Sequence, residues 1–434
     1  MKIFLIFHQG INILKDNGIL CFITTNYFIT AQGGRILRKD FYDRCSVDLL
    51  INFNELKIFE SAQGQHNLIT LLRKHPSNNE YSTEIINSNE IGIADNNLLK
   101  SIFERKSINS QYQVAQKNSL YDGSEHYLRL TGQENDNQKN IKNLDKSILL
   151  KILEKNFPLT KYCHIRQGIQ SAADKLTDRH ISKFKIKEKK GSGIFVLTQD
   201  ELKNLSLNNE EKKIIFPFYK NSQVKKFRLD ISKNKKVNYI IYLERNSSLD
   251  LYPNIKSHLQ KFRKILMARL EQYSEDYSWW CLHRSRDFNL ISQKKIVCPR
   301  RAKINNFAIE NGKYFEQSDI MIISIKNNFK TDILYEYLLG ILNSKLLYFW
   351  LSNRGKVKGD TLELYGKPLE EIPFKIVDLK VQNKVAEYSQ ILQTKFDKFI
   401  FDKLNGIIYN IYSISEKEIK VIEEKYPDSI SSNN

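Results

Sequence analysis

Residues 18–74 decide the fold of this chain, and they read GILCFITTNYFITAQGGRILRKDFYDRCSVDLLINFNELKIFESAQGQHNLITLLRK. The opening GILCFIT is a short apolar run after an Asp-Asn-Gly turn signal, which predicts a buried β-strand. Residues 33–42 place apolar side chains at helical spacing, with Arg35, Arg38 and Lys39 on the opposite, polar side. VDLLINF and NLITLLRK predict two further strands. We therefore expect the closing half of an α/β sheet, without its opening half.

The composition and the hydrophobic pattern along the chain predict four parts. Residues 1–75 contain a helix followed by the sheet segment. Residues 76–157 have short hydrophobic runs and many Asn, Ser and Gln residues, which indicates an irregular connection with small elements. A β-rich domain over 158–376 begins near a proline, and residues 377–434 have the periodicity of a helical tail.

The charge balance indicates a polyanionic partner. The 434 residues include 68 Lys and Arg against 49 Asp and Glu, which gives a formal net charge of +19. Such an excess favours nucleic acid, although an AT-rich genome that prefers Lys and Asn codons would produce it too. A third, weaker interpretation from charge alone is a protein that binds RNA or phosphate.

Other classes of protein are disfavoured by the sequence. No apolar run approaches the roughly 20 residues that span a bilayer, so we expect no membrane association. Five cysteines lie far apart without CxxC spacing, and eight histidines show no HxH or HExxH pattern. These features predict a cytoplasmic protein without a metal site or disulfide framework.

Several separated segments resemble, in the same order, a known family. It comprises the N6-adenine DNA methyltransferases of the TaqI type and their fused restriction–modification relatives. The segments are GILCFITTNYF, LKIFESAQGQHNLITLL, HIRQGIQSAADK, IIFPFYKNSQVKKF, IVCPRRAK, FAIENGKYFEQSDIMII, YLLGILNSKLLYFWL, LEEIPF and FDKLNGIIYNIYSISEKEIKVIEE. The resemblance implies the C-terminal half of a Rossmann-like methyltransferase sheet over 1–75. It further implies an α+β target-recognition domain over 158–376 and a helical tail over 377–434.

One departure from the family pattern bears directly on activity. Family members carry a glycine-containing S-adenosylmethionine loop, an acidic residue for the ribose and an Asn-Pro-Pro-Tyr motif, all upstream of the helix that begins this sequence. Neither Asn-Pro-Pro-Tyr nor Asp-Pro-Pro-Tyr occurs here. The resemblance implies that the complete enzyme uses S-adenosylmethionine. We expect this chain alone to bind none and not to methylate DNA.

The resemblance also assigns roles near the sheet. Phe59 matches the aromatic residue that stacks on the flipped adenine in the family. An extruded base needs an apolar face to replace its lost neighbours. Thr25 and Asn26 follow a strand, where ligands bind in open α/β sheets. The alternatives are a Phe that closes the end of the sheet and a turn with a side-chain cap.

The expected DNA contacts lie on basic and amide side chains in turns of the 158–376 domain. Arginine can fork a guanine or a phosphate, whereas lysine suits phosphates. A solvated turn remains the alternative for each of them. The candidates are Arg166, Gln167, Lys220, Lys225, Lys226, Arg300, Arg301 and Lys303.

Two functional readings follow. The favoured one is site-specific recognition of double-stranded DNA as the C-terminal part of an adenine-N6 methyltransferase, paired with a separate N-terminal methyltransferase chain. The contrasting one is a non-enzymatic DNA-binding specificity module that keeps the sheet only as a docking surface. A sheet cut in half exposes an unpaired edge, which promotes association, so we expect residues 1–75 to need a partner chain for full order.

Overall fold

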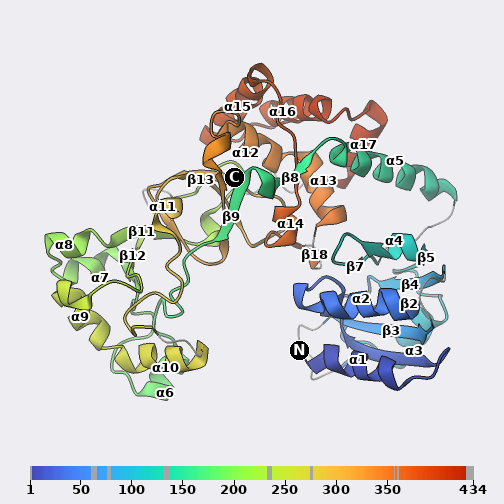
Figure 1. The fold of residues 1–434 in the computed structure, drawn as a ribbon, viewed down its shortest axis with the longest axis horizontal. Coiled ribbons are helices and arrows are strands. Elements are labelled where there is room, and N and C mark those ends of the chain that lie inside the picture. The colour runs from blue at the N-terminus through green and yellow to red at the C-terminus, as the bar shows by residue number, and fades with distance from the viewer. Residues whose placement is uncertain are drawn as a thin grey trace. The chain divides into compact units, whose positions relative to one another are not determined.

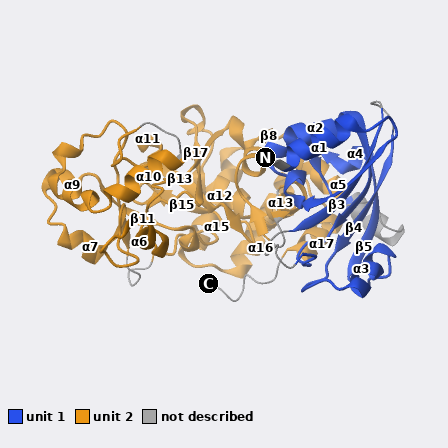
Figure 2. Cartoon of the chain, turned by 90° about the horizontal axis from the view of Figure 1, so that it is seen from below, with its two compact units in different colours: residues 1–144 blue, residues 145–434 orange. Residues whose placement is uncertain are grey.

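The computed structural model describes residues 2–59, 66–75, 80–130, 136–231, 237–273, 277–355, 357–358 and 361–426 (Figure 1). The chain divides into two compact units, Met1–Leu144 and Asp145–Asn434 (Figure 2). None of the helices among the described residues is both long and apolar enough to cross a membrane.

Unit 1 is built on a five-stranded sheet with the strand order β1-β3-β2-β4-β5. The strands β1, β2 and β3 and the helix α2 confirm the elements expected from residues 18–74. The bounds are α1 Lys2–Ile13, β1 Ile19–Thr25, α2 Arg35–Arg44, β2 Cys45–Asn52, β3 Asn67–Lys74, β4 Ser82–Ser88, α3 Asn96–Phe103, β5 Ser110–Gln116, α4 Lys117–Leu120, β6 Tyr121–Asp122 and β7 Tyr127–Leu128.

Helices cover both faces of this sheet (Figure 2). On one face, α1 and α2 bury Phe7 and Phe41 against Val47 and Leu72, and the rings of Phe7 and Phe41 meet edge to face at 5.3 Å. On the other face, α3 packs Ile102 onto a smaller apolar cluster. Burial of these side chains is the main stabilising contribution to unit 1.

Strand direction brings three strand ends to one edge of the sheet. β3 lies between β1 and β2 and is antiparallel to both, so β1 and β2 run the same way. β4 pairs with β2 in parallel. The carboxyl ends of β1, β2 and β4 therefore share one edge, which is where open α/β sheets bind ligands.

Residues 80–130, within the expected irregular connection, contain two further strands of the sheet. β4 and β5 extend the sheet, with Thr83 paired to Ala115, and the compact unit continues to Leu144. β5 reads SQYQVAQ and alternates between buried and exposed positions. A strand at the edge of a sheet can be largely polar on its exposed face, so short apolar runs did not reveal it.

Within the described residues, β1 pairs only with β3, so its other edge is open. Ile19 and Ile23 of β1 are exposed on one face. On the other face Gly10 of α1 packs against Leu20. Ile13 follows Gly10 at i+3, on the same side of the helix, and it is 81% exposed. Exposed apolar side chains therefore lie on β1 itself and on α1, the helix that packs against it.

Unit 2 combines small sheets with a helical region. The two larger sheets have the orders β10-β12-β11-β16 and β15-β13-β17-β9. The bounds are α5 Asp136–Leu153 (which begins within unit 1), β8 Phe157–Pro158, β9 Cys163–Gln167, α6 Asp178–Phe184, β10 Val196–Thr198, α7 Gln199–Asn204, α8 Asn209–Lys212, β11 Ile215–Tyr219, β12 Asn238–Ile241, α9 Pro253–Gln260, α10 Arg263–Tyr273, α11 Phe288–Ile291, β13 Lys294–Pro299, β14 Arg301–Ala302, β15 Ala308–Asn311, β16 Phe315–Glu316, β17 Ile320–Ile325, α12 Tyr335–Asn343, α13 Lys345–Arg354, β18 Val357–Lys358, β19 Thr361–Glu363, α14 Lys367–Glu370, β20 Pro373–Phe374, α15 Leu379–Thr394, α16 Lys398–Ile411 and α17 Glu416–Lys425.

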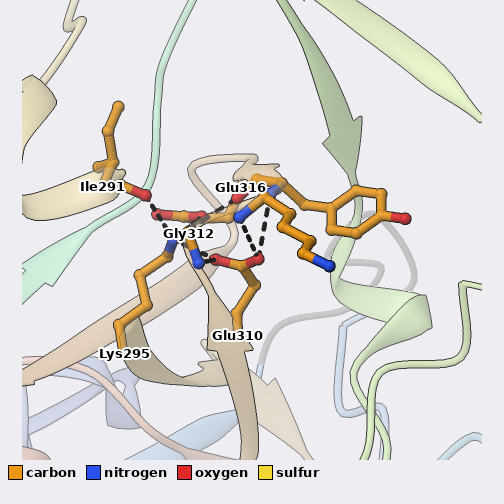
Figure 3. A network of polar contacts seen from close by, with 7 residues as sticks. Ile291, Lys295, Glu310, Gly312 and Glu316 are labelled. Carbon is orange, nitrogen blue, oxygen red and sulfur yellow. Dashed lines mark hydrogen bonds and ion pairs between the residues drawn. The ribbon is translucent and has the colours of Figure 1, made fainter. Parts of the chain in front are cut away.

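A buried ion cluster fixes β13 against β15 and β16 (Figure 3). Lys295 Nζ lies 2.5 Å from Glu310 Oε2, 2.5 Å from the Ile291 carbonyl and 3.5 Å from Glu316 Oε2. The hairpin turns at Gly312, whose φ of +79° suits glycine, and its N–H donates to Glu310. The cluster holds the strand whose far end leads into Arg300.

The helical tail is tied back to the start of unit 2. Ser415 and Glu418 form the capping box that begins α17. The carboxylate of Glu418 also accepts hydrogen bonds from Ser147 Oγ and Lys151 Nζ, each at 2.7 Å. One buried carboxylate therefore joins α5 to α17.

Candidate functional site

An amide network joins the strand ends at the carboxyl edge of the unit 1 sheet. Asn26, directly after β1, donates from Nδ2 to Asn52 Oδ1 at 3.3 Å. Asn52 ends β2 and donates to Asn54 Oδ1 at 2.7 Å and to Asn87 Oδ1 at 3.2 Å. Asn87 of β4 donates in turn to the Leu130 carbonyl at 2.6 Å. Only Asn26 of these residues was singled out from the sequence.

A buried donor without a partner lies at the same edge of the sheet. Asn67, which opens β3, pairs with Thr25 in the sheet register. It is 4% exposed, and its Nδ2 has no hydrogen-bond partner among the described residues. Next to it, the Asn26 N–H donates to the His66 carbonyl, and His66 Nδ1 lies 2.8 Å from the Asn54 carbonyl. Buried polar groups are usually paired, so this edge retains hydrogen-bonding capacity.

Phe59 lies in the loop that leaves the same strand end. Lys57 is held in a parallel bridge with Ile93, and Ile58 packs against the cluster under α3. Phe59 itself is 46% exposed. The ring is thus available to a planar ligand, and its stacking role remains a prediction.

The expectation that Arg38 lies on the polar side of its helix is wrong. The side chain is fully buried. Its Nη1 donates to the Phe28 and Ala31 carbonyls at 2.7 Å each, and its Nε donates to the Glu125 carbonyl at 3.0 Å. Burial lowers the pKa of Arg38, opposed by Tyr127 and Glu125. Because Phe28 and Ala31 belong to the segment after Asn26, Arg38 positions that segment.

The glycine that precedes α2 lies in a closely packed position. A Cβ added at Gly34, in the glycine pair before α2, would lie 2.7 Å from the Phe28 carbonyl oxygen and 2.8 Å from Arg38 Nη1. Close packing therefore accounts for this glycine. β1 and β2 end in Thr25 and Asn52, which offer hydroxyl and amide groups at this edge.

The basic residues that follow Pro299 lie on and beside β14 in unit 2. The Arg300 guanidinium lies 4.4 Å from the centre of the Tyr365 ring. Arg301 on β14 is exposed, and its Nε lies 3.1 Å from Glu363 Oε1. The hydrogen bond with Tyr365 and the nearby Glu363 raise the pKa of Arg301. Lys303 is exposed directly after β14.

Arg166 and Gln167 differ in availability. Arg166 is exposed on β9, where burial and this arginine together lower the pKa of His164. Gln167 is engaged within the fold, because Nε2 donates to the Ser318 carbonyl at 2.7 Å and Oε1 accepts from Arg286 Nη2 at 3.2 Å. Arg166 fits a DNA contact better than Gln167 does.

Lys226 contradicts its predicted role as a DNA contact. It is 4% exposed and donates from Nζ to the backbone and side-chain oxygens of Asn305 at 3.1 and 3.2 Å. Burial and nearby Lys345 hold its pKa well below the ordinary lysine value. Lys220 is exposed where the turn after β11 begins, and Lys225 is half-buried. Among the described residues, no group of His, Cys, Asp and Glu could hold a metal ion.

Two family models match this chain in separate segments. Residues 216–374 match the TaqI-like C-terminal specificity domain, and residues 2–59 match the Eco57I restriction-modification methylase. The first includes Arg300 and Arg301, and the second ends at Phe59.

Similar proteins extend the comparison over nearly the whole chain. The type II methyltransferase M.HindII of Haemophilus influenzae is 24% identical, over 95% of this chain and 71% of that protein. M.BstVI of Geobacillus stearothermophilus is 20% identical, over 96% of this chain and 68% of that protein.

A solved structure shares the fold. The type IIL restriction-modification enzyme MmeI in complex with DNA aligns with a TM-score of 0.51 and 11% identity. The alignment covers 96% of this chain and 50% of that chain. The chain thus spans about 70% of the length of the curated relatives and half of that solved chain. The resemblance found in the sequence is confirmed: residues 216–374 resemble the TaqI-like C-terminal specificity domain, and the chain is similar to type II methyltransferases of restriction-modification systems.

Proposed function

We propose that this chain recognises a specific double-stranded DNA sequence as the C-terminal part of an adenine-N6 DNA methyltransferase. S-adenosylmethionine would bind to a methyltransferase segment that this sequence does not contain. The observation that carries the proposal is the amide network at the carboxyl edge of the sheet, from which the loop that carries the exposed Phe59 leaves β2. The same edge of the sheet includes a buried donor, Asn67 Nδ2, that has no partner within the described residues.

This edge suits an extruded base. A base removed from the duplex loses its stacking neighbours and its Watson–Crick partner. Phe59 offers an aromatic face, worth about 1–3 kcal/mol for a stacked base. Thr25 and the amide network offer donors and acceptors for the base edge. The residues of this chain would orient the base, and the donor would supply the methyl group.

Sequence recognition is assigned to unit 2. Arg301 and Arg166 are exposed, and an arginine side chain can form bidentate hydrogen bonds to a guanine edge or a phosphate. Lys220 and Lys303 are suited to phosphates. Lys226 and Gln167 are left out of this interface because their side chains are engaged within the fold.

The open edge of β1 supports a partner for unit 1. An unpaired strand edge flanked by Ile19, Ile23 and Ile13 is costly to leave in water. We propose that a separate N-terminal methyltransferase chain pairs with β1 and brings the donor site with it. A second strand on this edge would satisfy the free backbone groups and cover the exposed apolar side chains.

Transfer of labelled methyl groups tests this function. The purified chain should transfer none from S-adenosylmethionine, and co-expression with a methyltransferase segment that carries the donor site should restore site-specific transfer to adenine. In the restored enzyme, Phe59→Ala should lower activity about 10- to 100-fold, as expected for a lost stack of about 1–3 kcal/mol. Transfer by the isolated chain would refute the proposed division. A soluble complex without transfer would favour a non-enzymatic specificity module.

A further inference from the structure

Unit 2 contains a basic groove remote in sequence from the candidates named above. It has a volume of about 840 Å³ and lies between the segment 183–188 at the end of α6 and the helices α9 and α10. The residues that line it are Lys183, Phe184, Lys185, Ile186, Lys187, Glu188, Gln260, Lys261, Arg263, Lys264, Met267, Ala268 and Glu271. We call it the α6–α10 groove.

The sequence KFKIK builds one wall by alternation. Phe184 and Ile186 are half-buried and pack against the core of the domain. Lys183, Lys185 and Lys187 alternate with them and are exposed. α6 ends here with Lys185 in the left-handed conformation, at a φ of +52°. An extended basic strip with an apolar base results.

The opposite wall comes from the two helices. Leu259, Phe262 and Leu266 bury the inner face of α9 and α10. Periodicity then leaves Lys261, Arg263 and Lys264 on the outer face, where all three are exposed. Helical packing therefore fixes these three cations opposite the lysines of the first wall.

The cations of the groove differ from their neighbours in being unneutralised. The groove has six Lys and Arg residues against Glu188 and Glu271. Nearby surface lysines are paired, as in Lys190–Asp178 and Lys256–Asp250. Over the described part of the chain, none of the six groove cations forms an ion pair with a carboxylate, although Arg263 lies over the Trp279 ring at 5.5 Å. Their repulsion favours a bound polyanion.

We propose that the α6–α10 groove binds the phosphodiester backbone of double-stranded DNA outside the recognised sequence. The proposal rests on the proposed function, which brings a continuous line of phosphates to unit 2. Five of the six cations are lysines, which act on phosphates as flexible point charges and carry little base specificity. The groove would strengthen binding to every sequence equally.

The test is the salt dependence of DNA binding by the full chain. The groove variant combines Lys185→Gln, Lys187→Gln and Lys264→Gln. The control variant removes the same charge from exposed positions of the helical tail, with Lys380→Gln, Lys384→Gln and Lys395→Gln. Anisotropy with a labelled duplex gives the slope of log K against log salt, which changes by about 0.9 for each phosphate contact.

We expect the groove variant to lower that slope by about 2–3 and the control variant to leave it within about 0.5, on recognised and unrelated duplexes alike. Equal slopes for the two variants, with DNA binding by the wild-type chain intact, would overturn the proposal that the groove binds DNA. The proposed function would remain in place. Absence of DNA binding by the wild-type chain would overturn both. If the groove variant lost affinity for polyglutamate alone in a parallel titration, the ligand of the groove would be an acidic polypeptide instead of DNA.

Discussion

Two buried carboxylates of unit 2, Glu316 and Glu418, have pKa values that are shifted in opposite directions. In both side chains burial disfavours the charged form, and by itself it would raise the pKa. For Glu418, hydrogen bonds from Lys151, Ser415 and Ser147 outweigh burial and bring the pKa to about 2. For Glu316, Lys295 is shared with Glu310, and the pKa is raised to about 7. The number of donors, not burial alone, decides which form is stable.

Replacing Glu418 should destabilise the junction of α5 and α17. Its pKa falls from 4.5 to about 2 on folding, so its contribution is present above about pH 4.5 and is lost as pH falls toward 2. Glu418→Gln should lower the free energy of unfolding by about 2–3 kcal/mol at pH 7 and by much less at pH 3. Urea titrations of both proteins at the two pH values check this, with exposed Glu424→Gln as the matched control.

Replacing Glu316 should have the opposite effect. Its folded-state pKa of about 7 exceeds 4.5, so ionisation opposes folding increasingly between those pH values. Glu316→Gln should raise the free energy of unfolding by about 1–3 kcal/mol at pH 8 and leave it unchanged at pH 4. Glu310→Gln, which removes the close partner of Lys295, should instead destabilise at pH 8. Loss of stability in Glu316→Gln at pH 8 would contradict this assignment.

At the level of elements, the sequence pattern predicted the strands and the helix whose formation depends mainly on residues close together in the sequence. Apolar runs in β1, β2 and β3 and the period of α2 indicated those elements correctly. Burial of Arg38 and Lys226 was missed, because their partners Glu125 and Asn305 lie 87 and 79 residues away. The amide network was missed for the same reason. It forms only when the ends of three strands meet.

Arg38 offers a test of how the edge segment is held. Arg38→Met removes a buried cation that serves three backbone carbonyls, and each buried acceptor left unpaired costs about 1–3 kcal/mol. We expect the unfolding free energy of unit 1 to fall by about 2–4 kcal/mol, with faster hydrogen exchange in the segment after Asn26. Arg35→Met, an exposed position on the same helix, is the control and should change neither.

At the scale of the whole chain, the proposed function is divided between two units. Unit 1 offers a sheet edge with an amide network and an exposed aromatic ring. Unit 2 offers exposed arginines and the TaqI-like specificity domain. The family resemblance was recognisable from ordered segments of sequence. Which basic side chains face solvent was not, because burial depends on packing between distant elements.

Selection from a pool of random duplexes tests the central claim most directly. The purified chain should enrich one recognised sequence over successive rounds, because exposed Arg166 and Arg301 can discriminate base edges by about 1–3 kcal/mol per contact. Arg301→Ala should relax the selected sequence at particular positions, whereas Lys380→Ala in the tail should leave it unchanged. Binding that stays equally strong for all sequences through every round would contradict site-specific recognition by this chain.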